Sequence, residues 1–445
     1  MKILFISLGC DKNLVDSEVM LGLLASRGYE MIDDEQEADI IVVNTCCFIH
    51  DAKQESVDNI LEMAEYKKTG KLKALIVTGC LAERYRQEII DEIPEVDAVL
   101  GTTAYDKILD AVDEALDGKH FLEMEDLRAL PVVDTKRQIT TGGHFAYMKI
   151  AEGCDKHCTY CIIPKIRGTY RSVPMEQLIK EAEELAAQGV KELILVAQET
   201  TLYGKDLYGE KSLHKLLKEL CKVSGIQWIR ILYCYPEEIT DELIQVIKEE
   251  PKICHYLDLP IQHANDEILK RMGRRTSKQE LIDIVTKLRK EIPDICLRTT
   301  LITGFPGETE EQHQELVEFV DEMEFDRLGV FTYSPEEDTP AATMADQIDE
   351  EVKLERQAEL MELQQEIAFD TAEKMIGREM LVMIEGKIAE EPAYVGRTYR
   401  DAPKVDGLIF VETGELLMSG DFAKVTVTGA EEYDLIGGLT NELTE

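Results

Sequence analysis

The chain has 445 residues, 44% of them hydrophobic, which is enough for about two to four domains with sizeable buried cores. It lacks a stretch of about 18 uncharged apolar residues and a small-residue cleavage site after its first apolar run, so we expect no membrane span and a cytoplasmic protein. The balance of 49 basic and 89 acidic residues gives a net charge of −40, which disfavours general nucleic-acid binding. Such a surface would attract a basic partner, or it serves solubility alone.

Residues 1–120 alternate apolar runs with amphipathic segments. Three runs indicate buried parallel strands, at residues 2–8, 38–45 and 73–79. Segments 16–28 and 52–68 indicate helices between them. This alternation predicts an α/β domain with a parallel, Rossmann-like sheet. Residues 121–143 predict an irregular linker, because they contain Pro131 and adjacent glycines.

The alternation continues from about residue 144 to 345. Six apolar runs indicate strands, at residues 145–153, 192–198, 228–235, 256–262, 296–304 and 328–334. Six parallel strands with helices between them predict a partial (β/α)6 barrel of the TIM type. The charged stretch 346–377 has the length and periodicity of a connecting helix.

The region from about Arg378 onward changes character. Short apolar runs separated by Gly, Pro and Asp predict a small antiparallel β-barrel, with strands at residues 380–387, 394–399, 407–412 and 422–429. We set the three domains at 1–120, 140–370 and 373–441.

The strongest local motif is GCDKHCTYCIIP, with Cys154, Cys158 and Cys161 spaced as CxxxCxxC. Three thiolates can bind a 4Fe–4S cubane and leave the fourth iron open to another molecule, whereas four thiolates close it. Zinc is an alternative, but a second pair of ligands is missing from the motif; purely structural cysteines are another. The loop follows the strand at 145–153, at the barrel face where active sites lie.

This motif resembles that of the radical S-adenosylmethionine superfamily. The resemblance implies that the open iron binds the amino and carboxylate groups of S-adenosylmethionine and that reductive cleavage gives a 5′-deoxyadenosyl radical. It also implies that Tyr160, the aromatic residue before the third cysteine, lies near the adenine. The alternative is a tyrosine that only packs the loop.

Cys10, Cys46 and Cys80 each stand at the C-terminal end of an expected strand. Their separations of 36 and 34 residues each fit one strand–helix unit, and parallel strands end at the same edge of a sheet. The pattern therefore predicts a second 4Fe–4S cluster, again with an open iron. Cys47 could compete with Cys46, but neighbouring side chains point apart, so we expect a spectator. The other cysteines are expected to be small buried hydrophobes: Cys221, Cys234, Cys254 and Cys296.

Two clusters, one of them radical-forming, followed by a β-barrel resemble the methylthiotransferases over nearly the whole chain. The resemblance implies an N-terminal methylthiotransferase domain, a radical core and a TRAM-type barrel. One class of this family modifies an adenosine of tRNA. The other, the RimO type, modifies the β-carbon of an aspartate in the twelfth small-subunit ribosomal protein.

Several stretches favour the RimO type. LGCDKNLVDSE is similar to its first cysteine motif, where the tRNA enzymes tend toward GCQMN. Further similar stretches are NTCCFI (44–49), TGCLAERY (78–85), VAQETTLYGKD (196–206), LYCYPEEIT (232–240) and LPIQHANDEILKRM (259–272), while RTTLITGFPGETE (298–310) is shared more widely. Val173 departs from the pattern, because the family often has a second arginine there.

Charge gives an independent indication of the acceptor. Residues 373–445 contain fifteen acidic and seven basic side chains, a balance of −8. A barrel that grips tRNA should be basic, whereas an acidic one suits a Lys- and Arg-rich ribosomal protein. We therefore expect a basic ribosomal protein as partner, with tRNA as the runner-up. A non-enzymatic iron–sulfur electron carrier is a third alternative.

The family resemblance implies a reaction sequence. A sulfur species at the Cys10–Cys46–Cys80 cluster is methylated by one S-adenosylmethionine, and a second is cleaved at the other cluster. The radical takes a hydrogen atom from the substrate carbon, which then captures the methylthio group. A sulfur donor and an electron donor protein are needed, and the cluster ligands are the only catalytic residues that we assign.

Three further residues are predicted to contact cofactor or substrate. Gln198 and Gln262 end the second and fourth barrel strands, at the active-site face. The alternative is that they hydrogen-bond to loops. Gly304 lies in TGFPGET, which predicts a tight turn that brings backbone close to a ligand, or else a purely structural turn. His263 receives no catalytic role.

Overall fold

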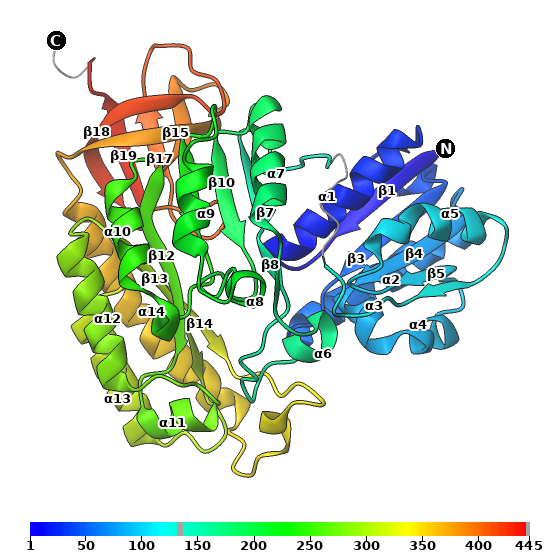
Figure 1. Ribbon diagram of the computed structural model, residues 1–445, viewed down its shortest axis with the longest axis horizontal. Coiled ribbons are helices and arrows are strands. Elements are labelled where there is room, and N and C mark those ends of the chain that lie inside the picture. Colours follow the sequence, from blue (N-terminus) through cyan, green and yellow to red (C-terminus); the bar gives the residue numbers. More distant parts are fainter. Residues whose placement is uncertain (131–136, 442–445) are drawn as a thin grey trace.

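The computed structural model describes residues 1–130 and 137–441, which form an N-terminal α/β domain, a central core and a C-terminal barrel (Figure 1). Part of the expected linker, residues 131–136 with Pro131, lies outside the described residues. In the two described ranges, no helix combines the length and the apolar character needed to cross a membrane.

The N-terminal sheet has the order β2-β1-β3-β4-β5-β6, and all of its pairs are parallel. Its strands are β1 (Lys2–Ser7), β2 (Glu30–Met31), β3 (Ile40–Thr45), β4 (Ala74–Gly79), β5 (Ala98–Leu100) and β6 (Phe121–Glu123). The Rossmann-like domain is confirmed. The short strands β2, β5 and β6 were not predicted, and β6 falls in the segment expected to be irregular. It is ordered because it pairs with β5.

Helices cover both faces of this sheet. They are α1 (Asp11–Ser26), α2 (His50–Thr69), α3 (Cys80–Tyr85), α4 (Gln87–Glu92) and α5 (Ile108–Leu116), with the 3-10 turns η1 (Glu35–Glu37) and η2 (Tyr105–Lys107). Along β3, Ile40 and Val42 pack with α1 and α5, while Ile41 and Val43 pack with α2. Every residue of β3 is therefore buried, as expected for a strand covered on both faces.

The core is an open six-stranded sheet in the order β14-β13-β12-β11-β10-β7, with every pair parallel. Its strands are β7 (Phe145–Lys149), β10 (Glu192–Val196), β11 (Trp228–Ile231), β12 (Ile253–Gln262), β13 (Cys296–Thr303) and β14 (Arg327–Thr332). The partial (β/α)6 barrel is thus confirmed. A small antiparallel pair follows β7, formed by β8 (Ala151–Glu152) and β9 (Arg171–Ser172).

Helices follow the core strands, and the longer ones form the outer layer of the core (Figure 1). They are α6 (Ile163–Arg167), α7 (Met175–Ala187), α8 (Lys205–Tyr208), α9 (Leu213–Leu220), α10 (Asp241–Glu249), α11 (Asp266–Arg271), α12 (Lys278–Glu291) and α13 (Glu310–Met323), with the 3-10 turns η3 (Pro236–Glu238) and η4 (Pro340–Thr343). The predicted connecting helix is α14 (Glu350–Glu373). It packs along β14 and leads to the barrel.

The C-terminal barrel is closed, in the order β15-β16-β17-β19-β18. Its strands are β15 (Glu379–Lys387), β16 (Ala393–Thr398), β17 (Ile409–Glu412), β18 (Phe422–Glu431) and β19 (Asp434–Leu439). All pairs are antiparallel except β17 with β19, which is parallel. The barrel is confirmed, with one more strand than the four expected.

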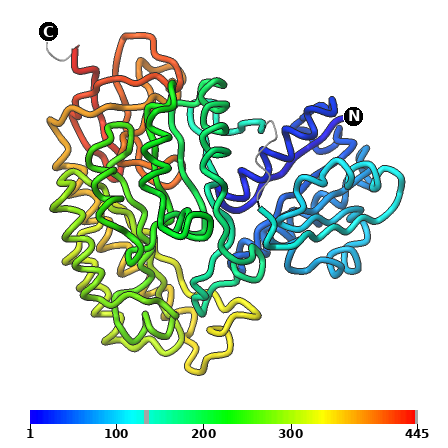
Figure 2. The backbone as a smooth tube through the Cα atoms, viewed as in Figure 1, coloured from blue at the N-terminus to red at the C-terminus, as the bar shows by residue number. Residues whose placement is uncertain are grey.

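The barrel packs on the amino ends of the core strands, on a different side of the core from the N-terminal domain (Figure 2). Trp228, the first residue of β11, meets Phe422 of the barrel edge to face, with ring centroids 4.8 Å apart. Arg397 of the barrel donates to the buried carboxylate of Glu192, the first residue of β10, at 2.7 Å. The carboxyl ends of the core strands therefore remain free for a functional site.

Candidate functional site

Cys10, Cys46 and Cys80 follow three neighbouring strands of the N-terminal sheet. Cys10 caps the start of α1 after β1, Cys46 directly follows β3, and Cys80 opens α3 directly after β4. Because β1, β3 and β4 are adjacent and parallel, the three thiols lie at one edge of the sheet. Gly9, at φ +85°, lies so close to this edge that a Cβ there would be 2.9 Å from the Cys46 sulfur.

The three thiols are within electrostatic reach of one another. Burial raises the pKa of the Cys46 and Cys80 thiols, and the Cys10 thiol adds to the rise in both. Iron binds the thiolate form, so a bound cluster must supply the positive charge that holds these groups deprotonated. Cys47 is fully buried in the core beside α2, where burial raises its pKa to about 12. Its role as a spectator stays a prediction.

The CxxxCxxC loop begins where β8 ends, at the carboxyl end of the first core strand. Gly153 stands at φ +79°, and a Cβ there would lie 2.2 Å from the backbone oxygen of Thr169. The Cys154 amide donates to the Gly168 oxygen at 3.1 Å, so the loop is held against the segment that follows α6. Burial raises the pKa of the Cys154 thiol to about 12, and that of Cys161 is raised for the same reason.

The predicted cofactor contacts differ in their surroundings. Tyr160 packs on a small apolar cluster around Met272 and Phe305, and burial raises the pKa of its hydroxyl. Gln198 donates from Nε2 to Glu152 at 2.6 Å, while its Oε1 is buried without a hydrogen-bond partner.

Gln262 and Gly304 both adopt positive φ angles, of +73° and +68°. Gln262 is half-buried at the end of β12. At Gly304 the space that a Cβ would need is filled by Lys353, at 2.2 Å from its Cγ. This close approach is to the chain itself, which favours the structural-turn alternative at Gly304.

Several charged and aromatic side chains surround the CxxxCxxC loop of residues 154–161, called the radical loop below, and the sequence assigned none of them a role. Burial raises the pKa of Glu199 to about 7, although Lys156 stands 3.5 Å away and opposes the rise. The Tyr235 ring lies 4.3 Å from the Arg274 guanidinium, and its hydroxyl is 3.9 Å from the Cys158 sulfur. The signal available in the sequence was the run of polar residues that follows each strand end.

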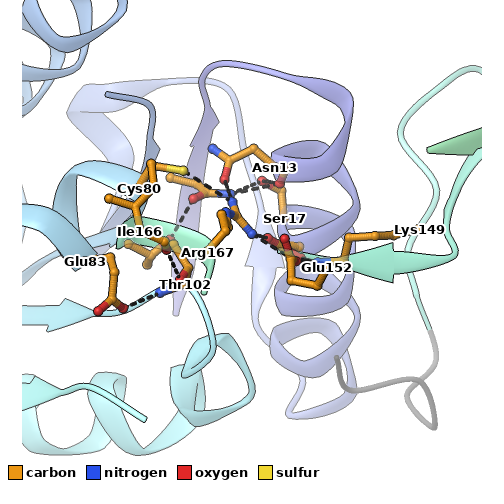
Figure 3. Close-up of polar contacts among 12 residues, drawn as sticks. Asn13, Ser17, Cys80, Glu83, Thr102, Lys149, Glu152, Ile166 and Arg167 are labelled. Carbon is orange, nitrogen blue, oxygen red and sulfur yellow. Dashed lines mark hydrogen bonds and ion pairs between the residues drawn. The ribbon is translucent and has the colours of Figure 1, made fainter. Parts of the chain in front are cut away.

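A buried network of charges joins the N-terminal domain to the core beside Cys80 (Figure 3). Asp16 of α1 pairs with Lys149 of β7 and, at 2.7 Å, with Arg167 of α6. Glu152 accepts from the same two cations, at 2.7 Å and 3.2 Å. Two acids and two bases balance, which offsets the cost of burying them. Sequence offered one hint, because Lys149 is a charged residue inside an apolar strand.

A second contact joins the domains on the segment that follows β14. Arg84 of α3 pairs with Glu336 at 3.1 Å and donates to the Glu337 backbone oxygen at 2.9 Å. The His50 amide at the start of α2 donates to the Ser334 hydroxyl at 3.3 Å. The two domains are therefore joined by two separate sets of polar contacts.

The donor set fits iron–sulfur clusters. Each site offers three cysteines, and each of the chain's eleven cysteines is a free thiol. Across residues 1–130 and 137–441, no group of three or more His, Cys, Asp or Glu side chains is arranged around a single metal ion. A cubane makes a different demand, since each of its thiolates binds a different iron. The remaining cysteines lie outside both sites: Cys234, Cys254 and Cys296 are buried, and Cys221 is half-buried.

Three family models match the three parts of the chain. The model described as uncharacterized protein family UPF0004 matches residues 2–101, the radical SAM superfamily model matches residues 148–320, and the TRAM domain model matches residues 376–439.

Curated relatives match the chain over its whole length. A protein of Lachnoclostridium phytofermentans named ribosomal protein uS12 methylthiotransferase RimO is 68% identical, over 98% of this chain and 99% of its own. A protein of Clostridioides difficile with the same name is 51% identical over 100% of both chains.

Solved structures share the fold at low identity. The radical S-adenosylmethionine methyltransferase TsrM from Kitasatospora setae, solved with cobalamin and a [4Fe-4S] cluster, superposes with a TM-score of 0.55 at 14% identity, over 76% of each chain. The cobalamin-dependent S-adenosylmethionine radical enzyme OxsB gives 0.50 at 13% identity, over 81% of this chain and 56% of its own.

Proposed function

Because this chain belongs to the RimO family of ribosomal protein uS12 methylthiotransferases, we propose that it installs a methylthio group on the β-carbon of an aspartate in uS12, the twelfth small-subunit ribosomal protein. The chain is a radical S-adenosylmethionine methylthiotransferase. The proposal of methylthio transfer with two clusters rests on one observation: the chain has two three-thiol sites, one on each side of a buried domain interface.

In this proposal both sites hold a 4Fe–4S cluster. Cys10, Cys46 and Cys80 would bind one, and the CxxxCxxC loop, with Cys154, Cys158 and Cys161, would bind the other. When bound, the clusters and S-adenosylmethionine supply a radical, which the unreactive C–H bond of an aspartate β-carbon requires. The chain itself holds the two sites in a fixed relation and keeps water from them, since most of these thiols are buried.

We assign Tyr160, Gln198 and Gln262 to the S-adenosylmethionine or substrate side of the radical loop. The unpartnered Oε1 of Gln198 supports this, because a buried acceptor without a donor favours a ligand that brings one. The contact between Gly304 and Lys353 supports a structural role there instead.

The acidic barrel is proposed to face the basic substrate protein. Arg397 and Arg400 are buried in ion pairs with Glu192 and Asp326, so their charges are already neutralised. Asp401 and Asp406 are buried in the same way against Arg327 and Arg298 of the core. The two buried acids and two buried arginines cancel, so the remaining residues keep the balance of −8. A sulfur donor, an electron donor protein and a cytoplasmic location complete the proposal, with domain limits at 1–120, 140–370 and 373–441.

Anaerobic reconstitution tests the two-cluster proposal. The chain should bind about eight irons, and the variant with Cys154, Cys158 and Cys161 replaced by Ala should keep about four. Cys221→Ala is the matched control, because it removes a thiol outside both sites and should keep all iron. If the unmodified chain binds only about four irons, the proposal of two clusters is contradicted.

Mass spectrometry tests the acceptor. The reconstituted chain, given S-adenosylmethionine, sulfide and a reductant, should add the mass of a methylthio group to an aspartate of uS12 and leave tRNA unchanged. Modified tRNA with unmodified uS12 would instead support the tRNA class. Absence of S-adenosylmethionine cleavage would point to an electron carrier.

A further inference from the structure

We propose that Arg167 is a positioning residue that holds Cys80 and sets the reduction potential of the N-terminal cluster, although it belongs to the segment that follows the other cysteine motif. The inference rests on the proposed function in one respect, namely that Cys10, Cys46 and Cys80 hold a cluster.

Helix α6, which ends at Arg167, is built into the N-terminal domain. Ile162 and Ile166 pack in the same apolar cluster as Cys80. The Thr102 hydroxyl of the N-terminal domain donates to the Ile166 backbone oxygen at 2.8 Å (Figure 3). A segment that begins just after Cys161 therefore carries its last side chain to the edge where β4 ends.

The Arg167 guanidinium divides its donors between the two domains. Nη2 donates to Asn13 Oδ1 at 2.8 Å and lies 3.5 Å from the Cys80 sulfur, both in the N-terminal domain (Figure 3). Nη1 donates to Asp16 at 2.7 Å and to Glu152, beside the radical loop, at 3.2 Å. The side chain is only 2% exposed, so its orientation is fixed by these partners.

Two physical effects follow at the Cys80 sulfur. An N–H donor and a positive charge stabilise the thiolate and the more negative, reduced state of a cluster, which raises its reduction potential. A partner in the second coordination shell also fixes the ligand's orientation, and losing such a partner typically lowers metal affinity about 10- to 100-fold. Through Arg167, the radical loop segment therefore controls a ligand of the other cluster.

The test uses the full chain with Cys154, Cys158 and Cys161 replaced by Ala, so that only the N-terminal cluster titrates. Iron is counted first, and then the potential is measured by electron paramagnetic resonance during titration with dithionite, which supplies the single electron. In this background Arg167→Met should shift the potential downward and lose iron to a chelator about tenfold faster or more.

Two companion variants separate the effect of the hydrogen bond to Cys80 from the effect of the positive charge near it. Arg167→Lys keeps the charge but loses the planar donor pair, so it should shift the potential less than Arg167→Met and still lose iron faster than the parent. Lys149→Met removes a cation from the same network without touching Cys80, and should change the potential by less than half as much as Arg167→Met.

The outcomes are distinct. An Arg167→Met chain that binds about four irons at an unchanged potential overturns the inference and leaves the cluster proposal standing. If that variant does not fold, Arg167→Lys decides the matter by iron retention and potential together. Equal shifts in Arg167→Met and Lys149→Met would mean that the hydrogen bond to Cys80 adds nothing to the effect of the charge, and would overturn the inference. A parent background without iron would overturn the cluster proposal itself.

Discussion

Replacing Gly153 with alanine tests whether the radical loop depends on a close approach between two backbone segments. An alanine Cβ would lie 2.2 Å from the Thr169 oxygen and 2.6 Å from the Gly168 oxygen. Both contacts are backbone atoms, so a side-chain rotation cannot relieve them. The peptide units after α6 must move, and the Cys154 amide, which donates to the same Gly168 oxygen, must move with them.

The cost has two parts. A left-handed backbone costs an L-residue about 1–2 kcal/mol. Relief of the overlap adds about 1–3 kcal/mol, the usual cost of overpacking a tight site. The matched control is Gly209→Ala in the same domain, because Gly209 has φ +76° against +79° for Gly153 and has no neighbouring atom within 4 Å of its added Cβ. The control should therefore lose only the first part, about 1–2 kcal/mol.

Urea unfolding of the metal-free chains measures this difference, and iron analysis after anaerobic reconstitution measures its consequence. We expect Gly153→Ala to lose about 2–5 kcal/mol of unfolding free energy and about four of about eight irons. Gly209→Ala should keep all of its iron. Equal stability losses in the two variants, with full iron in Gly153→Ala, would refute the steric argument.

Three other variants probe separate parts of the molecule. Cys80→Ala should still cleave S-adenosylmethionine but lose methylthio transfer, and full transfer activity would remove the N-terminal cluster from the mechanism. Burial raises the pKa of Glu308, but two buried histidines and Arg356 outweigh it, so its folded-state pKa lies below 4.5. Glu308→Gln should therefore lower the free energy of unfolding by about 1–3 kcal/mol at neutral pH. The difference from the parent chain should vanish as the pH falls through the folded-state pKa of Glu308, and a pH-independent difference in urea unfolding would contradict this. Changing the exposed Glu431 and Glu432 to Lys should weaken uS12 binding, and the loss should be largest at low salt because salt screens charges over about 10 Å at 0.1 M ionic strength. Unchanged affinity in calorimetry would count against the acidic barrel as the docking surface.

The position of the cysteines could be predicted because it depends on local patterns. Cys10, Cys46 and Cys80 each follow an apolar run, and the rule that parallel strands end at one edge needs no knowledge of distant contacts. The same logic failed for β19, whose sequence DLIGGL contains two glycines. A Cβ at Gly437 would lie 2.5 Å from Val425 Cγ1, so the glycine is there to let two barrel strands approach. That requirement appears only once the barrel is closed.

The charge network could not be predicted from the sequence. Asp16 and Arg167 are 151 positions apart, and Lys149 and Asp16 are 133 apart, so their pairing depends on how two domains dock. Helix α1 illustrates the same limit. It was expected to begin near Asp16, and it begins at Asp11, because its polar first turn is buried against the core instead of exposed.

The way the barrel joins the core has a consequence for cooperativity. Met383 and Ala402 of the barrel share one apolar cluster with Phe145, Tyr147 and Tyr256 of the core sheet. An interface with such an apolar centre resists the independent motion that separate domains usually show. The barrel is therefore expected to keep one orientation relative to the core. A substrate protein bound to the barrel must therefore extend its target residue to the carboxyl ends of the core strands, because the barrel packs on their amino ends. Core and barrel should also melt in a single transition, and a chain cut at α14 would expose the rings that the barrel now covers.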